Sequence, residues 1–206
     1  MQLKQYQTDT LSVLRRFFEE TRVAGPKNAY EAITREPEHK VRLGAYADEY
    51  RPLKGLPGVP YVCLRLPTGG GKTILGAYSI AISKDTWIEK DYPLVLWLVP
   101  SNTIRIQTAE ALKNTRHPYR RALDEAFEGR VRIFDISGFA QIRPHDIRDN
   151  LCVVVGTIQA LRVRQATRRR GPQQSLRPRF RDLVPESGES PVRQASRHGI
   201  RGRRGA

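Results

Sequence analysis

Four short apolar runs are separated by longer stretches in which apolar residues recur with a helical period. The runs cover residues 61–66, 94–99, 131–136 and 151–155. Continuous, β-branched runs of this length are typical of strands buried on both faces of a parallel sheet. The stretches between them predict helices over 73–87, 103–114 and 119–127. Strand and helix therefore alternate, which predicts an α/β fold with a parallel sheet flanked by helices.

The segment before these runs predicts one amphipathic helix. Its apolar residues recur at helical spacing, at Leu11, Leu14, Phe17 and Phe18. Thr8 or Asp9 is the candidate cap at its start. Gly25 with Pro26 predicts its end.

The next segment, residues 26–58, is polar and rich in proline and glycine. We interpret it as an insertion or linker with short helical pieces near 28–35 and near Tyr46. The expected organisation thus has four parts. They are an N-terminal helix (1–25), the insertion (26–58), an incomplete sheet domain (59–163) and a basic tail (164–206).

The composition changes in the last part of the chain. The formal net charge is +15, yet residues 1–161 hold 23 Lys and Arg against 18 Asp and Glu. Residues 162–206 hold 13 Arg, no Lys and 3 acids, so two thirds of the charge lies there. Segments rich in Arg, Pro, Gly and Ser cannot bury enough apolar surface to order themselves, which predicts disorder over 164–206.

Two origins of this tail fit its composition. A lysine-free sequence rich in Arg, Gly, Pro and Ser is what a GC-rich gene gives when it is translated in the wrong frame, so the tail can belong to a frameshifted or truncated product. The alternative is a genuine arginine-rich tail, which would bind nucleic acid without sequence preference and in a salt-sensitive way.

The strongest chemical signal lies between Pro67 and Thr73, where three glycines precede Lys72. A predicted strand precedes this segment and a predicted helix follows it, which is the context of a phosphate-binding loop. Glycines let backbone N–H groups converge on an anion, and the helix adds its positive end. Lys72 is expected to reach the β- and γ-phosphates of a nucleotide, and the Thr73 hydroxyl to bind Mg²⁺. The strict pattern has glycine where this chain has Leu66.

With Pro67 and Thr68 included, the loop resembles motif I of superfamily 2 helicases. Three further segments resemble motifs of the same proteins, and the resemblance is to the helicase subunit of type III restriction endonucleases and related DEAD/DEAH-box-like ATPases. It covers roughly residues 1–163. It implies a RecA-like P-loop NTPase domain, ATP and Mg²⁺ as cofactors, and DNA as a partner. For an intact parent protein it also implies a modification methyltransferase subunit.

The Tyr6-Gln7 pair resembles the glutamine motif upstream of the loop, in which a Gln amide reads the adenine edge. An amide offers a donor and an acceptor side by side, as that edge requires. The alternative is an exposed helix glutamine without a ligand. The resemblance implies Lys72 and Thr73 as catalytic residues. It implies as nucleotide-binding residues Gln7, Thr68, Gly69, Gly70, Gly71, Lys72 and Thr73.

Two segments at the ends of predicted strands resemble elements that hold a nucleic-acid backbone. Pro100, Ser101 and Asn102 resemble motif Ia, and short polar side chains beside free helix N–H groups suit a phosphate. Thr157 and Gln159 belong to a segment that resembles the Thr-x-Gln-x-Leu stretch of the same family. The alternatives are a helix-capping cluster for the first and a plain strand-to-helix turn for the second.

The family's next element, an apolar strand ending in Asp-Glu-x-His, has no counterpart after residue 161. In the family the Asp holds Mg²⁺ and the Glu polarises the attacking water. The three acids of the tail, Asp182, Glu186 and Glu189, follow no apolar run. Asp135 ends a predicted strand and is the rival for the missing carboxylate, with a helix cap as the alternative.

These features together predict a motor-domain fragment that binds ATP with Mg²⁺ and DNA weakly and turns over little alone. The alternatives are a nucleic-acid-binding protein dominated by its basic tail, and a small complete NTPase that uses Asp135. No apolar run of about 18 residues occurs, so we expect no membrane span and a cytoplasmic location. Cys63 and Cys152 lie in apolar runs and are expected to be buried thiols.

Overall fold

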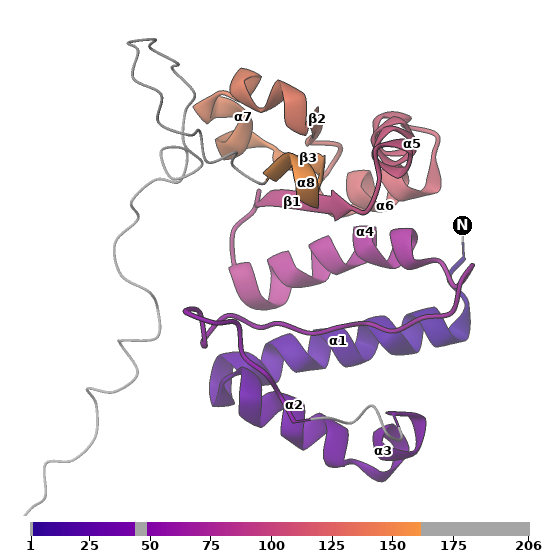
Figure 1. Cartoon of the computed structure of the whole chain (residues 1–206), viewed down its shortest axis with the longest axis vertical. Coiled ribbons are helices and arrows are strands. Elements are labelled where there is room, and N and C mark those ends of the chain that lie inside the picture. Colours follow the sequence, from indigo (N-terminus) through magenta and orange to yellow (C-terminus); the bar gives the residue numbers. More distant parts are fainter. Residues whose placement is uncertain (1, 44–48, 162–206) are drawn as a thin grey trace, which may run out of the picture. The chain divides into compact units, whose positions relative to one another are not determined.

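The computed structural model describes residues 2–43 and 49–161. The helical piece predicted near Tyr46 and the tail predicted over 164–206 lie outside these residues. Three helices come first, and Figure 1 shows them on one side of the molecule: α1 (Gln5–Ala24), α2 (Pro26–Arg35) and α3 (Pro37–Leu43). The rest of the described chain consists of α4 (Lys72–Ser83), η2 (Lys84–Ile88), β1 (Leu94–Val99), α5 (Asn102–Lys113), α6 (Pro118–Ala126), β2 (Val131–Asp135), η3 (Ile136–Gln141), α7 (Pro144–Asp149), β3 (Leu151–Thr157) and α8 (Ile158–Leu161).

The first helix begins earlier than predicted. The N–H of Lys4 donates a hydrogen bond to Oε1 of Gln7 at 2.9 Å, and the helix starts at Gln5. Thr8 and Asp9 therefore lie inside the helix, and the prediction that either caps it is wrong. The Gln7 side chain reaches back to the N–H of Lys4, the residue before the helix, as the third helical residue of a capping box does. The predicted end is confirmed, because Gly25 has φ 81° and its N–H bonds to the Thr21 carbonyl.

The predicted insertion begins with α2, which packs against α1. Phe17, Ala29, Ile33 and Tyr50 form a small buried cluster between these helices and the chain that returns from α3. Pro26 stands at the start of α2, where its missing N–H costs nothing. The first half of the segment is thus an ordered helical layer with its own apolar contacts.

The sheet has three parallel strands in the order β1-β3-β2 within the described chain. Val99 at the end of β1 pairs with Thr157 at the end of β3. All residues of β3 are buried, as its continuous apolar run predicts. The predicted strands over 94–99, 131–136 and 151–155 are confirmed within two residues.

Both faces of the central strand are covered. Val153 and Val155 belong to the main core, together with Leu75 of α4, Leu112 of α5 and Leu123 of α6. On the other face, the Cys152 thiol donates to the Asp146 carbonyl in α7 at 3.3 Å. Helices therefore flank the parallel sheet as predicted, and the fold is a RecA-like α/β domain.

The strand predicted over 61–66 is wrong. This stretch is extended and runs beside α1 in Figure 1, but it pairs with no strand of the described chain. Val62, Leu64 and Leu66 are half-buried against the core, while Cys63 between them is exposed. The apolar residues are thus buried against helices, and no strand of the described chain lies alongside to pair with their backbone. The expectation that Cys63 is a buried thiol is also wrong, because alternate side chains of an extended segment face opposite ways.

Candidate nucleotide-binding site

The glycine segment before α4 is curled into a tight loop. Gly69 has φ 77° and Gly71 has φ 79°, both in the left-handed region that glycine adopts without steric cost. The N–H of Gly70 donates to the Pro67 carbonyl at 3.0 Å and closes a turn between them. The loop predicted from the sequence is therefore present and ends at the first residue of a helix.

Two of the glycines lie where no side chain fits. A Cβ on Gly70 would stand 2.9 Å from the Pro67 carbonyl oxygen, a backbone atom that cannot give way. A Cβ on Gly71 would overlap Nε2 of Gln7. The glycines are thus required by the close approach of backbone and neighbouring helix as well as by the positive φ angles.

The start of α4 presents N–H groups without partners. The N–H groups of Gly71, Lys72 and Thr73 make no hydrogen bond to another residue of the described chain, as is usual in a first helical turn. No acidic side chain lies in that turn. Free donors and the positive end of a 12-residue helix make this junction fit a phosphate group.

The lysine expected to meet a phosphate bonds back to the loop in this structure. Lys72 is exposed, and its Nζ donates to the Pro67 carbonyl at 2.8 Å. Thr73 follows it and is half-buried, while Thr68 at the loop entrance is exposed. A bound triphosphate would draw the Lys72 ammonium from this carbonyl, because a charged acceptor makes the stronger hydrogen bond.

Gln7 and Tyr6 reach the loop from the first turn of α1. Nε2 of Gln7 donates to the Gly70 carbonyl at 3.1 Å, and the Tyr6 hydroxyl donates to the same oxygen at 3.1 Å. Gln7 is buried, and its Oε1 accepts the N–H of Lys4. The alternative of an exposed helix glutamine is therefore wrong, because Gln7 is buried. The reading of an adenine edge by Gln7 stays a prediction.

The two predicted backbone-binding segments lie together at the carboxyl edge of the sheet. Pro100, Ser101 and Asn102 follow the end of β1 and are exposed, and Thr157 ends the neighbouring strand β3. Gln159 follows in α8 and is exposed. The pairing of Val99 with Thr157 brings the two segments to one edge.

Structural roles for part of this set are visible. Oγ of Ser101 accepts the N–H of Ile104 at 3.3 Å, so Ser101 caps α5. Oγ1 of Thr157 accepts the N–H of Ala160 at 3.3 Å, and Thr157 is 5% exposed. Gln159 and Pro100 have no such hydrogen bond to another described residue. Oδ1 of Asn102 accepts a hydrogen bond from Nε of Arg105 at 3.4 Å, so among the exposed members Pro100 and Gln159 are the ones without such a contact in the described chain.

The phosphate loop lies at this same edge. Gly76 of α4 packs against the ring of Trp97 near the end of β1, whereas Ile80 and Ser83 lie near Pro93 and Leu94 at the strand's start. The helix and the strand thus run in opposite directions, and α4 begins where β1 ends, as Figure 1 shows. Nucleotide candidates and nucleic-acid candidates share one end of the domain.

Asp135, the rival metal carboxylate, is engaged elsewhere. Its Oδ1 accepts the N–H of Ser137 at 2.9 Å and the Ser137 hydroxyl at 2.7 Å, which caps η3. It also forms an ion pair with Arg105 of α5. This arrangement favours the cap interpretation. Arg105 was not identified from the sequence, because its spacing from Asp135 gives no sign that α5 contacts the end of β2.

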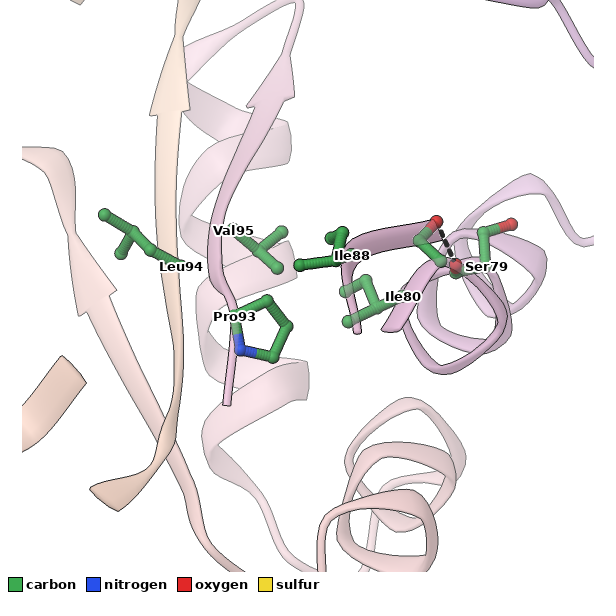
Figure 2. A pocket seen from close by; sticks show the side chains of 7 residues that line it. Ser79, Ile80, Ile88, Pro93, Leu94 and Val95 are labelled. Carbon is green, nitrogen blue, oxygen red and sulfur yellow. Dashed lines mark hydrogen bonds between the residues drawn. The ribbon is translucent and has the colours of Figure 1, made fainter. Parts of the chain in front are cut away.

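A shallow apolar hollow of about 260 Å³ lies at the opposite end of α4. Figure 2 shows its lining from α4, η2 and the start of β1. The Ser79 and Ser83 hydroxyls bordering it donate to helix carbonyls at 2.7 Å. Both serine hydroxyls are thus engaged within the helix and leave the hollow apolar. The hollow is separate from the phosphate loop.

Metal ligands are sparse in the described chain. No group of three His, Cys, Asp or Glu side chains that could hold a metal ion occurs among residues 2–43 and 49–161. The Thr73 hydroxyl at the start of α4 remains the candidate Mg²⁺ ligand, in a shell completed by phosphate oxygens and water. The loop therefore fits the phosphates of ATP better than it fits a metal ion alone.

The fold and the loop define a helicase-like P-loop ATPase domain. The family model described as type III restriction enzyme, res subunit, matches residues 1–184. The chain belongs to this family. The match extends beyond residue 163, where the sequence resemblance was expected to end. Searches among curated proteins and among solved structures returned no match.

This membership confirms the predicted resemblance and supports its coarser consequences. The family is helicase-like and typically ATP- and Mg²⁺-dependent, and membership implies interaction with nucleic acid. Among the described residues, no helix is both long enough and apolar enough to span a membrane.

Proposed function

We propose that this chain binds ATP with Mg²⁺ at Pro67 to Thr73 and a DNA backbone at the carboxyl edge of its sheet. It serves as the first motor domain of a helicase or translocase ATPase of the restriction type. The observation that carries this proposal is the curled loop with free N–H groups at the start of α4. Anion binding at such a junction follows from its partial positive charge.

Lys72 is the residue on which nucleotide affinity depends most. Lys72→Ala removes the ammonium that would meet the β- and γ-phosphates, and we expect the affinity for ATP to fall at least tenfold, as for the loss of a charge-assisted hydrogen bond. Isothermal titration of the full chain with Mg·ATP measures this. Lys54→Ala, an exposed lysine remote from the loop in sequence, is the matched control. Equal ATP affinity in the Lys72 variant and the unaltered chain would refute the proposal.

Turnover by the chain alone is proposed to be low. The sequence holds no Asp-Glu-x-His strand, and Asp135 is paired with Arg105 and caps η3. A small complete NTPase that uses Asp135 is the alternative. For that alternative Asp135→Ala would abolish hydrolysis while leaving nucleotide binding intact. For the favoured function it would lower stability and leave the low basal rate unchanged.

DNA binding is proposed to involve the exposed edge residues Asn102 and Gln159. The charge of the tail favours a second candidate, a nucleic-acid-binding protein dominated by residues 162–206. Two sets of substitutions in the full chain separate them. Asn102→Ala with Gln159→Ala weakens DNA binding under the first function. Replacing Arg168, Arg169 and Arg170 by alanine weakens it and flattens its salt dependence under the second.

The remaining parts of the proposal concern the surroundings of the protein. We propose a cytoplasmic location, and a modification methyltransferase subunit as the partner of an intact parent protein. A frameshifted origin of residues 164–206, suggested by their composition, belongs to the same proposal. Sequencing the genomic DNA downstream tests it, since a helicase continuation in another frame must then be present.

A further inference from the structure

We propose that Tyr6 is a positioning residue of the phosphate loop, which acts with Gln7 on the Gly70 carbonyl to aim the Gly71 N–H at a phosphate. This inference rests on the proposed nucleotide function of the loop. It concerns the conformation of the loop. It gives α1 a role in phosphate binding that does not depend on the nucleotide base.

The two donors converge on one oxygen from a distant part of the chain. The Tyr6 hydroxyl and Nε2 of Gln7 each lie 3.1 Å from the Gly70 carbonyl oxygen. A carbonyl oxygen has two lone pairs, so both hydrogen bonds can form at once. The first turn of α1 therefore fixes the direction in which this carbonyl points.

The direction of that carbonyl determines the direction of the next N–H. In a trans peptide the C=O of one residue and the N–H of the next point to opposite sides of the same plane. With the Gly70 oxygen turned toward α1, the N–H of Gly71 points away from α1. It has no partner in the described chain and stands beside the free N–H groups of Lys72 and Thr73.

The glycines make this control necessary. Gly71 has φ 79°, and glycine has wide conformational freedom, so the loop's own sequence restrains the peptide plane weakly. The Gly70 N–H is used in the turn to Pro67 and holds only one side of the loop. Side chains from α1 supply the restraint on the other side.

Gln7 is itself anchored for this task. Its Oε1 accepts the Lys4 N–H at 2.9 Å while its Nε2 donates to Gly70, and the residue is 6% exposed. Both ends of the amide are thus engaged in the protein. The pair therefore acts on the loop, and its removal should affect every ligand that contains the same phosphates.

The experiment compares three probes on the full chain, each with Mg²⁺: inorganic tripolyphosphate, ATP and GTP. Tyr6→Phe removes only the hydroxyl, and we expect the affinity for all three probes to fall by the same factor, roughly 3- to 10-fold for one hydrogen bond. Gln7→Glu keeps an acceptor for the Lys4 N–H but loses the donor to Gly70, and should weaken all three probes further. Tyr61→Phe is the matched control, because the Tyr61 hydroxyl makes no hydrogen bond to another described residue and Tyr61 is 56% exposed.

A loss that is merely structural is separated by a second readout. The ¹H–¹⁵N resonance of Gly71 should move on tripolyphosphate binding in the unaltered chain, and should move less in Tyr6→Phe at equal saturation. The melting temperature of Tyr6→Phe should stay close to that of Tyr61→Phe. A fall in melting temperature without a change in the Gly71 response overturns the inference.

The remaining outcomes distinguish failure of this inference from failure of the proposed nucleotide binding. If Lys72→Ala binds tripolyphosphate as well as the unaltered chain, the proposed function fails. If Lys72→Ala weakens binding but Tyr6→Phe does not, only the inference fails. If Tyr6→Phe weakens ATP alone and leaves GTP and tripolyphosphate unchanged, Tyr6 contacts the base and the inference is overturned.

Discussion

Two extended segments of this domain are buried in different ways. β3 lies between two partner strands, with every residue buried and its backbone paired on both sides. Residues 61–66 bury only alternate side chains and pair with no strand of the described chain. Backbone hydrogen bonds hold the first segment, and side-chain packing holds the second. The glycine loop follows the second segment, so the proposed ligand site adjoins a stretch without strand pairing in the described chain.

A matched pair of leucines gives the largest expected difference between these segments. Leu151 in β3 has no exposed surface, and Leu151→Ala should lower the free energy of unfolding by about 2–5 kcal/mol. Leu64 is half-buried, and Leu64→Ala should cost about 1 kcal/mol. Urea unfolding of both variants measures the two values. Equal losses would mean that residues 61–66 are held as firmly as the sheet.

A pair of glycines tests whether the loop conformation itself binds phosphate. Gly71→Ala combines a positive φ with an overlap on the Gln7 side chain, so tripolyphosphate affinity should fall at least tenfold, and the strained backbone should cost about 1–2 kcal/mol. Gly25 has a similar φ of 81° but ψ 160°, a backbone region essentially confined to glycine, and no neighbour lies within 4 Å of its Cβ position. Gly25→Ala should therefore lose at least as much stability as Gly71→Ala and keep its affinity. Loss of affinity in both variants would point to general unfolding.

A cap substitution sharpens the comparison at the carboxyl edge of the sheet. Ser101→Ala removes the acceptor for the Ile104 N–H and should lower stability by about 1 kcal/mol. Ser101→Asp should restore the cap, because aspartate is equally favoured there. If Ser101 also meets a DNA phosphate, the Asp variant should bind DNA more weakly than the Ala variant. Equal DNA affinities would leave Ser101 with the cap alone.

Labelling of the two cysteines is the least perturbing test, because it needs no substitution. Burial raises the pKa of the Cys152 thiol to about 11, and the nearby Asp146 carboxylate adds to this. At pH 8 very little thiolate is present at Cys152, so iodoacetamide should modify exposed Cys63 and spare Cys152. Peptide mass spectrometry measures this. Faster labelling of Cys152 would show that the sheet opens before residues 61–66 do.

Local signals in the sequence predicted most of the helices and the loop. The helices predicted from Thr103 and Tyr119 begin one residue earlier in the structure, because capping residues and proline mark their starts. The presence of the glycine loop was predictable because its glycines and the helix that follows them are adjacent in the sequence. These features follow from interactions within a few positions along the chain.

The errors concern interactions between distant residues. The run over 61–66 has the composition of a strand, but pairing needs a partner edge that local sequence cannot reveal. The contact of Gln7 and Tyr6 with Gly70 spans more than 60 residues, and the ion pair of Arg105 with Asp135 joins a helix to a strand end. The resemblance identified Gln7 as a candidate, but its partners emerged only from the folded arrangement.

The resting contact of Lys72 with the Pro67 carbonyl has a consequence for how the loop can be altered. The acceptor is a main-chain atom, so replacing Pro67 by another residue leaves that oxygen in the chain. Side-chain substitutions at position 67 therefore do not remove the acceptor of this hydrogen bond. A phosphate bound at the loop would exchange one hydrogen bond of the ammonium for another, and the hydrogen bond to Pro67 could form again once the phosphate left.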